Sequence, residues 1–273
     1  MRILLTNDDG VGELGNVILA QVLLDAGHDL IVIGPASERS GSGTAIGAIE
    51  HGATIALEER VIATSPPLTA YAIDAPPSMA VIAAVSGVFG PRPDLVISGI
   101  NAGHNVGRSI LFSGTVGAAV SAAVMGIPSI AISSGFAPHH RFDTAAHVAE
   151  RVVDWFAASG MPRICVNVNV PDVDVGELQG CRVTHLAPRS MFSIELSREA
   201  DALTLRRRPD GRPVDGTTDI DALLERNISV SALRPLESVS DLACAGLAEH
   251  LSGAYLSELG DMTLGSPLKG SLT

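Results

Sequence analysis

The chain begins with MRILLTNDDG (residues 1–10), an apolar run that ends in two adjacent carboxylates, Asp8 and Asp9. An apolar run followed by a polar turn and a helix pattern, here over about residues 13–26, is typical of the first strand of an α/β sheet. The carboxylates then lie at the carboxyl end of that strand, where open parallel sheets bind their ligands. Burial raises the pKa of neighbouring carboxylates unless a cation compensates their charge. Because Asn, Asp and Gly also favour turns, residues 7–10 alone leave a plain turn and a metal site as alternatives.

Strand and helix patterns alternate over about the first 160 residues, which predicts parallel β-α-β units. Further apolar strands are expected at residues 30–33, 95–98, 129–133 and 163–170, and an amphipathic helix at residues 142–157. From Cys181 the pattern changes, and residues 182–185 and 191–196 are predicted as antiparallel strands. We therefore expect a Rossmann-like three-layer α/β core with a mostly parallel sheet in residues 1–180. Residues 181–273 are expected to form a β-rich extension and a C-terminal oligomerisation arm that pack on this core.

The composition limits the classes of function. With 273 residues, of which 46% are hydrophobic, the chain can bury a sizeable core. A formal net charge of -12 excludes polymeric nucleic acid as an expected partner, because phosphate backbones attract clusters of Lys and Arg. The three widely spaced cysteines predict neither a disulfide framework nor a structural zinc site. No cleavage signal follows the first strand and no segment offers ~18 uninterrupted apolar residues, so we expect a cytoplasmic protein with no membrane partner.

Two further loops follow predicted core strands and carry oxygen-bearing side chains. Residues 39–44 contain the hydroxyl of Ser40, and residues 98–107 contain the amides of Asn101 and Asn105. Hard divalent cations prefer carboxylate, amide and hydroxyl oxygens. If the strands are neighbours, these loops converge with the first one. The predicted metal ligands are Asp8, Asp9, Ser40 and Asn101, and the predicted cofactor is one divalent ion, Mg²⁺ or Mn²⁺.

Three other polar features have a functional and a structural interpretation. Residues 113–115, Ser-Gly-Thr, begin a small-residue helix that either presents N–H groups to an anion or is an ordinary capped core helix. His104 lies between the two amides, and a lone loop histidine is more often structural than catalytic. The arginines at 206–208 are expected at a solvated hairpin end, with phosphate binding as the less favoured alternative.

Taken together, these segments resemble the SurE family of metal-dependent nucleotidases and phosphatases. The matching stretches are residues 1–10, 39–41, 98–103 with Asn105 and Gly107, and 113–119, with weaker matches at 218–219, 229–231 and 235–236. The resemblance implies a Rossmann-like core with a swapped β-rich extension, a homodimer or homotetramer, and hydrolysis of phosphate monoesters, typically nucleoside monophosphates.

The resemblance also implies roles for particular residues. One divalent ion per subunit is held by Asp8, Asp9, Ser40 and Asn101. Asn105, Ser113, Gly114 and Thr115 lie against the phosphate. The expected catalytic residues are Asp8, Asp9 and Asn105, where Asp9 accepts a proton from the attacking water or orients it, and Asn105 stabilises charge on the phosphoryl oxygens.

The chain departs from the family pattern around the expected substrate pocket. The differing segments are residues 11–15 and 74–79, together with Arg108, Ser109 and Phe112. A specialised non-nucleotide phosphatase and a pseudo-enzyme that binds metal and nucleotide without turnover therefore remain as alternatives. A receiver-type signalling module is disfavoured, since residues 98–101 lack the phosphate-accepting Asp. A dinucleotide-binding oxidoreductase is disfavoured because the first turn lacks a glycine-rich phosphate loop.

Overall fold

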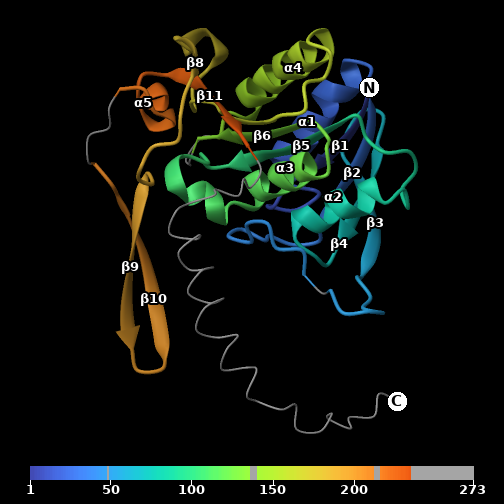
Figure 1. The fold of residues 1–273 in the computed structure, drawn as a ribbon, viewed down its shortest axis with the longest axis horizontal. Helices are drawn as coiled ribbons and strands as arrows, with labels where there is room; N and C mark the ends of the chain where they lie inside the picture. Colours follow the sequence, from blue (N-terminus) through green and yellow to red (C-terminus); the bar gives the residue numbers. More distant parts are fainter. Residues whose placement is uncertain (48, 136–139, 212–215, 235–273) are drawn as a thin grey trace, which may run out of the picture. The chain divides into compact units, whose positions relative to one another are not determined.

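The computed structural model describes residues 1–47, 49–135, 140–211 and 216–234. In these residues the chain forms a nine-stranded sheet and a two-stranded hairpin (Figure 1). The strands are β1 (Arg2–Thr6), β2 (Asp29–Pro35), β3 (Leu57–Ile62), β4 (Leu68–Ile73), β5 (Leu95–Ala102), β6 (Ser129–Ser134), β7 (Cys165–Asn169), β8 (Gly180–Val183), β9 (Phe192–Glu199), β10 (Ala202–Pro209) and β11 (Asn227–Leu233). The helices are α1 (Leu14–Asp25), α2 (Pro77–Val85), α3 (Gly114–Val124), α4 (Phe142–Ala158) and α5 (Asp219–Leu224), with 3-10 turns η1 (Gly107–Phe112) and η2 (Val175–Glu177).

The strand order of the large sheet, β3-β4-β2-β1-β5-β6-β7-β11-β8, identifies a doubly wound fold. The chain proceeds from β1 to β2 on one side, and later from β5 to β6 on the other, all in parallel pairing. The carboxyl ends of β1 and β5 therefore flank the point at which the winding direction reverses. Ligands in open α/β sheets bind at such a switch point.

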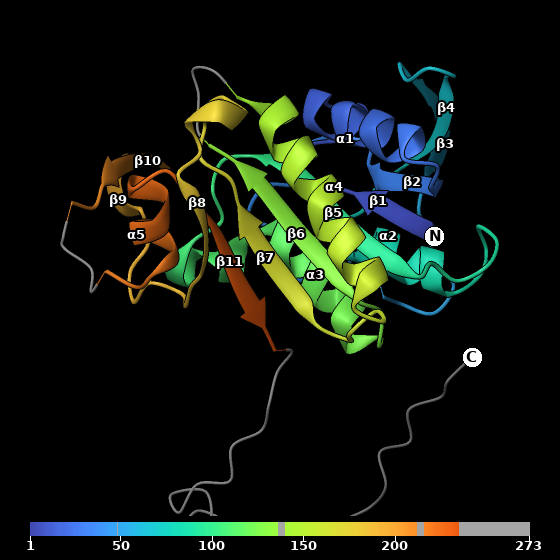
Figure 2. The ribbon, with the colours of Figure 1, turned by 90° about the horizontal axis from the view of Figure 1, so that it is seen from above.

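Helices cover both faces of the sheet (Figure 2). Ile3 and Leu5 of β1 pack in the cluster that includes residues of α1 and α4, whereas Leu4 packs in the cluster with α2 and α3. Because both faces of the central strands are buried, their sequences are continuously apolar rather than alternating. This arrangement confirms the predicted three-layer α/β core with a mostly parallel sheet.

Most of the predicted core elements agree with the structure, and one pairing differs. The helix expected at residues 142–157 is α4, and the strand expected at 163–170 contains β7. The strand expected at 191–196 lies in β9, which pairs antiparallel with β10. The expected antiparallel strand at 182–185 is wrong, since β8 pairs parallel with β11. The reason is that β11 itself runs antiparallel to β7 and reverses the direction at this edge.

The expected extension contributes to two sheets. Strands β8 and β11 complete the large sheet, while β9 and β10 form the separate hairpin. The oligomerisation arm falls largely in residues 235–273, which lie outside the described residues. Within the described ranges, no helix has the length and apolar character needed to cross a membrane.

Candidate metal and phosphate site

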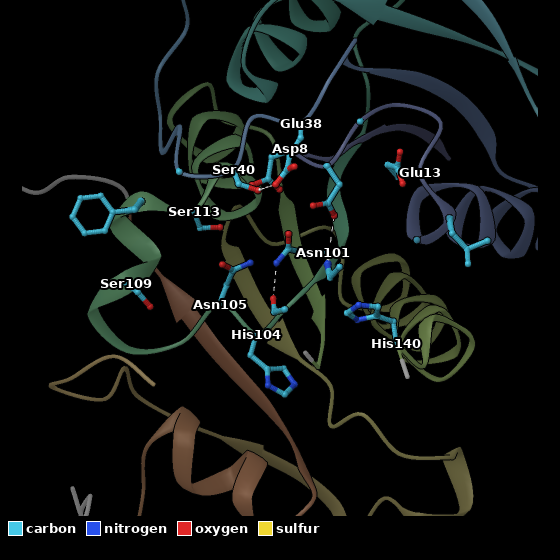
Figure 3. A pocket seen from close by; sticks show the side chains of 18 of the residues that line it. Asp8, Glu13, Glu38, Ser40, Asn101, His104, Asn105, Ser109, Ser113 and His140 are labelled. Carbon is cyan, nitrogen blue, oxygen red and sulfur yellow. Dashed lines mark hydrogen bonds between the residues drawn. The ribbon is translucent and has the colours of Figure 1, made fainter. Parts of the chain in front are cut away.

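A cavity of about 930 Å³ opens at the switch point (Figure 3). The three loops predicted to converge there do so, since each contributes residues to its lining. The lining includes these predicted site residues: Asp8, Asp9, Ser40, Asn101, Asn105 and Ser113. The other two, Gly114 and Thr115, are buried beneath it and do not belong to the lining.

Asp8 lies two residues after the end of β1 and is only 4% exposed. Its carboxylate accepts a hydrogen bond from the Thr115 hydroxyl and further bonds from the backbone N–H groups of Gly114 and Thr115. Burial nevertheless raises the pKa of Asp8 above its usual range. The first N–H groups of α3 thus hold a carboxylate of the protein itself. Thr115 and Gly114 contact Asp8 in this structure, where the resemblance placed them against the phosphate.

Asp9 is less buried than Asp8 and lies beside it. Its Oδ2 accepts a hydrogen bond from the Ala102 N–H at 3.4 Å. Burial and the adjacent charge of Asp8 raise the pKa of Asp9 to about 6, with smaller contributions from Glu38 and Glu13. A divalent cation between the two carboxylates would attract both of them and outweigh their mutual repulsion.

Ser40 and Asn101 add neutral oxygen atoms to the pair. The Ser40 hydroxyl donates to Glu38 Oε1 at 2.8 Å. Asn101 donates through Nδ2 to the Gly103 carbonyl, so that Oδ1 is the atom it can offer to a cation. No cluster of three or more His, Cys, Asp and Glu side chains in the described part of the chain could hold a metal. These residues therefore fit a hard divalent ion that takes two carboxylates and neutral oxygens, and they do not fit a thiolate- or imidazole-bound metal.

Asn105 and Ser113 form the uncharged part of the site. Asn105 Nδ2 donates to Ser133 Oγ at 2.9 Å. Ser113 is the N-cap of α3 and accepts the Val116 N–H at 3.0 Å through its Oγ, which leaves its hydroxyl hydrogen for a further acceptor. Both side chains therefore present polar groups to the cavity without adding negative charge.

His104 and the arginine run are placed as follows. His104 Nε2 lies 2.9 Å from the Val170 carbonyl oxygen, and burial lowers the pKa of the imidazole. A neutral imidazole bonded to backbone agrees with the structural interpretation.

The arginines lie on the exposed strand β10, where Arg208 pairs with Glu195 at 2.8 Å. Arg207 lies on the same strand and lines the cavity, which is the position that the less favoured alternative of phosphate binding requires.

Sequence reasoning missed the buried polar residues behind the loop that carries Asn105. Asn167 and Asn169 of β7 hydrogen-bond the backbone of Asn105, and Asp219 accepts the Gly107 N–H at 2.7 Å. The pattern Cys-Val-Asn-Val-Asn of β7 carried a signal, because two amides at alternate positions share one face of a strand buried on both faces. The signal from Asp219 was weaker, since a single Asp after Thr218 also fits a helix start.

A doubly wound sheet with a polar cavity at its switch point is typical of the class of α/β proteins that bind a small ligand at that edge of the sheet. Residues 3–193 match the family described as "Survival protein SurE". The chain is 37% identical over 217 residues to 5'-nucleotidase SurE of Nostoc sp., covering 78% of this chain and 76% of that protein. It is 34% identical over 242 residues to 5'-nucleotidase SurE of Paramagnetospirillum magneticum, covering 85% and 89%.

The structural comparison agrees with the sequence comparison. The crystal structure of the SurE protein from Aquifex aeolicus superposes with a TM-score of 0.74 at 26% identity, covering 92% of this chain and 100% of that chain. The chain belongs to the SurE family, which confirms the resemblance, and it is a phosphomonoester hydrolase. SurE family nucleotidases depend on a divalent metal ion.

Proposed function

We propose that this enzyme hydrolyses nucleoside 5'-monophosphates with one Mg²⁺ or Mn²⁺ ion held by Asp8, Asp9, Ser40 and Asn101. The observation that carries the proposal is the pair of adjacent, partly buried carboxylates at the switch point, each with a raised pKa. Such a pair is unfavourable without a cation and favourable with one. The relatives named 5'-nucleotidase SurE support the nucleotide as substrate.

The two carboxylates have different environments, which supports different roles. Asp8 is fixed by Thr115 and the start of α3, so it is suited to hold its position as a ligand. Asp9 is more accessible and accepts only one long hydrogen bond from the protein, so it is suited to orient an attacking water or accept its proton. A bound divalent ion supplies electrostatic stabilisation of the phosphoryl oxygens and favours ionisation of the attacking water.

Asn105 and Ser113 are assigned to the phosphoryl group. The Ser113 hydroxyl can donate a hydrogen bond into the cavity, because its oxygen lone pair is used by the Val116 N–H. The Asn105 Nδ2 donates one hydrogen to Ser133 Oγ and keeps a second N–H for another acceptor. Neutral donors aimed at the phosphoryl oxygens stabilise the charge that develops as the ester bond breaks. Gly114 and Thr115 are assigned to hold Asp8.

A second candidate substrate class is favoured by the position of one segment. Residues 11–15, which depart from the family pattern, all line the cavity. In the other departing segment, Asp74 forms an ion pair with Arg39, next to Ser40, and does not line it. The leaving group therefore meets an unusual wall near Glu13 and Leu14, which supports a specialised phosphate ester as the alternative to a nucleotide.

Phosphate release from a panel of substrates tests the proposal. The panel contains nucleoside 5'- and 3'-monophosphates, a generic aryl phosphate and non-nucleotide phosphomonoesters, each with Mg²⁺, with Mn²⁺ and with chelator. We expect metal-dependent release that is fastest from nucleoside 5'-monophosphates. Release restricted to other esters would replace the nucleotide with the second candidate. Metal and nucleotide binding without release would identify a pseudo-enzyme.

A homodimer or homotetramer is part of the proposal. The side chains at alternate positions of β9 and β10 share one face of the hairpin, and four large apolar ones, Ile194, Leu196, Leu203 and Leu205, are 53–68% exposed. An exposed apolar strip on an extended hairpin favours burial against another subunit. Sedimentation velocity should give a dimer or tetramer, and a monomer at micromolar concentration would contradict this assignment.

A further inference from the structure

The backbone of Asn105 is hydrogen-bonded on both sides by one buried side chain. Asn169 Oδ1 accepts the Asn105 N–H at 2.8 Å, and Asn169 Nδ2 donates to the Asn105 carbonyl at 2.9 Å. Asn169 is fully buried at the carboxyl end of β7. Both polar groups of the Asn105 peptide backbone are therefore satisfied by a strand 64 residues further along the chain.

The side chain of Asn105 is held by the neighbouring strand. Its Nδ2 donates to Ser133 Oγ at 2.9 Å, and Ser133 of β6 is also fully buried. Ser133 pairs in register with Asn169 on one side and with Asn101 on the other. A row of polar side chains thus runs from the proposed metal ligand Asn101 to the residue that holds Asn105.

Asn167 provides an internal comparison, because it is equally buried on the same face of β7. Its Nδ2 donates to the Asn105 carbonyl at 2.9 Å, a group that Asn169 also serves. Its Oδ1 has no partner among the described residues. Removing Asn167 therefore leaves both Asn105 backbone groups bonded, whereas removing Asn169 takes away the partner of the part-buried Asn105 N–H.

We propose that Asn169 is a positioning residue that fixes Asn105 against the phosphoryl group, independently of the metal ligands and of the leaving group. This inference rests on the proposed function of the cavity. An apolar side chain would fill the space under the loop equally well, but it would not orient the Asn105 peptide. The loop is held again two residues later, where Gly107 N–H donates to Asp219 Oδ2 at 2.7 Å.

The test compares Asn169→Ala with the matched control Asn167→Ala. We expect Asn169→Ala to lower kcat/KM roughly 10- to 100-fold. This is the usual loss when a residue that orients a functional group through hydrogen bonds is removed. The factor should be equal for an aryl phosphate and a nucleotide, and Mn²⁺ affinity measured by calorimetry should be unchanged. Asn167→Ala should lose about threefold or less in kcat/KM and should lower Tm less than Asn169→Ala, because it breaks one hydrogen bond to Asn105 rather than two.

A double-mutant cycle separates positioning from general destabilisation. If Asn169 acts through Asn105, the variant Asn105→Ala/Asn169→Ala should be no slower than Asn105→Ala alone. Losses that multiply, or an Asn167→Ala variant as slow as Asn169→Ala, would overturn the proposal. Should Asn169→Ala not fold, Asn169→Leu, which has a similar shape and makes neither bond, takes its place in the same cycle.

Amide hydrogen exchange gives a readout that does not need activity. Exchange over residues 103–107 should accelerate in Asn169→Ala and stay near the wild-type rate in Asn167→Ala. Unchanged exchange in Asn169→Ala would refute the positioning role even in an active enzyme. If exchange is faster in Asn169→Ala but the wild-type protein hydrolyses no phosphomonoester, Asn169 still positions the loop and the proposed function is wrong.

Discussion

The carboxylate part and the amide part of the cavity differ in how well they are satisfied without a ligand. Asp8 and Asp9 repel each other, and burial raises both pKa values. The amides of Asn105 and Asn169 are paired with backbone and side-chain partners in the protein alone. The first part is therefore completed only by a cation, whereas the second is already formed before substrate arrives. The unfavourable electrostatics of the site without a ligand thus lie in Asp8 and Asp9, whereas hydrogen bonds within the protein already hold Asn105 in place.

The largest effect is expected from Asp9→Asn. This change removes the proton acceptor and one proposed metal ligand, so phosphate release should fall by at least about 10³-fold at saturating Mg²⁺. A discontinuous phosphate assay measures it, with Asp25→Asn on the exposed end of α1 as the control. Near-normal turnover in Asp9→Asn would break the assignment of function to the carboxylate part.

Asn105→Ala tests the amide part. It should lower kcat/KM by about 10²-fold, the loss typical of a neutral donor to developing charge. Mn²⁺ affinity should stay at the wild-type value, because the change leaves all four proposed ligands in place. Weakened Mn²⁺ binding, measured by calorimetry, would show that the amide part also contributes to metal binding and would contradict the separate roles of the two parts.

Gly114→Ala tests the carboxylate part because it displaces Asp8 without changing its charge. A Cβ at this position would lie 2.7 Å from Asp8 Cβ and 2.8 Å from Oδ2. We expect about tenfold weaker Mn²⁺ binding, as when a group that orients a ligand is disturbed. Gly160→Ala, where a Cβ meets no atom within 4 Å but φ is positive, controls for general backbone strain. Equal Mn²⁺ affinity in both variants would contradict the proposed role of Asp8.

The smallest effect is the pH dependence of stability without metal. The pKa of Asp9 is raised in the folded protein from 3.8 to about 6, so the folded state binds the proton more tightly than the unfolded state. Stability should therefore fall as pH rises from about 4 to 6, by about 1 kcal/mol after allowance for the partial exposure of Asp9. Thermal unfolding in chelator, compared with Asp9→Asn, isolates this contribution. A difference that grows in the opposite direction would contradict the raised pKa.

The sequence predicts which segments line the cavity, and the reason is physical. Continuous apolar runs require burial on both faces, which places them in a parallel sheet and their following loops at one edge. Asp8, Asp9 and Ser40 lie in such loops, Asn101 lies at the carboxyl end of β5, which extends beyond the strand predicted at 95–98, and all four line the cavity. Their assignment as ligands stays a prediction.

The remaining features depend on contacts between distant segments. The bond from Thr115 to Asp8 joins residues 107 positions apart and depends on how closely α3 approaches β1. The contact of Asn169 with Asn105 requires β7 to lie beside β6, which local patterns do not specify. The parallel pairing of β8 with β11 likewise follows from the reversed direction of β11. Local residue propensities do not predict any of these three contacts.

Anomalous scattering from crystals grown with Mn²⁺ would show whether the two carboxylates bind the ion. We predict one anomalous peak per subunit, within roughly 2.0–2.6 Å of oxygen atoms of Asp8, Asp9, Ser40 and Asn101. A map with no peak between the two carboxylates, or a peak bound by other residues, would contradict it.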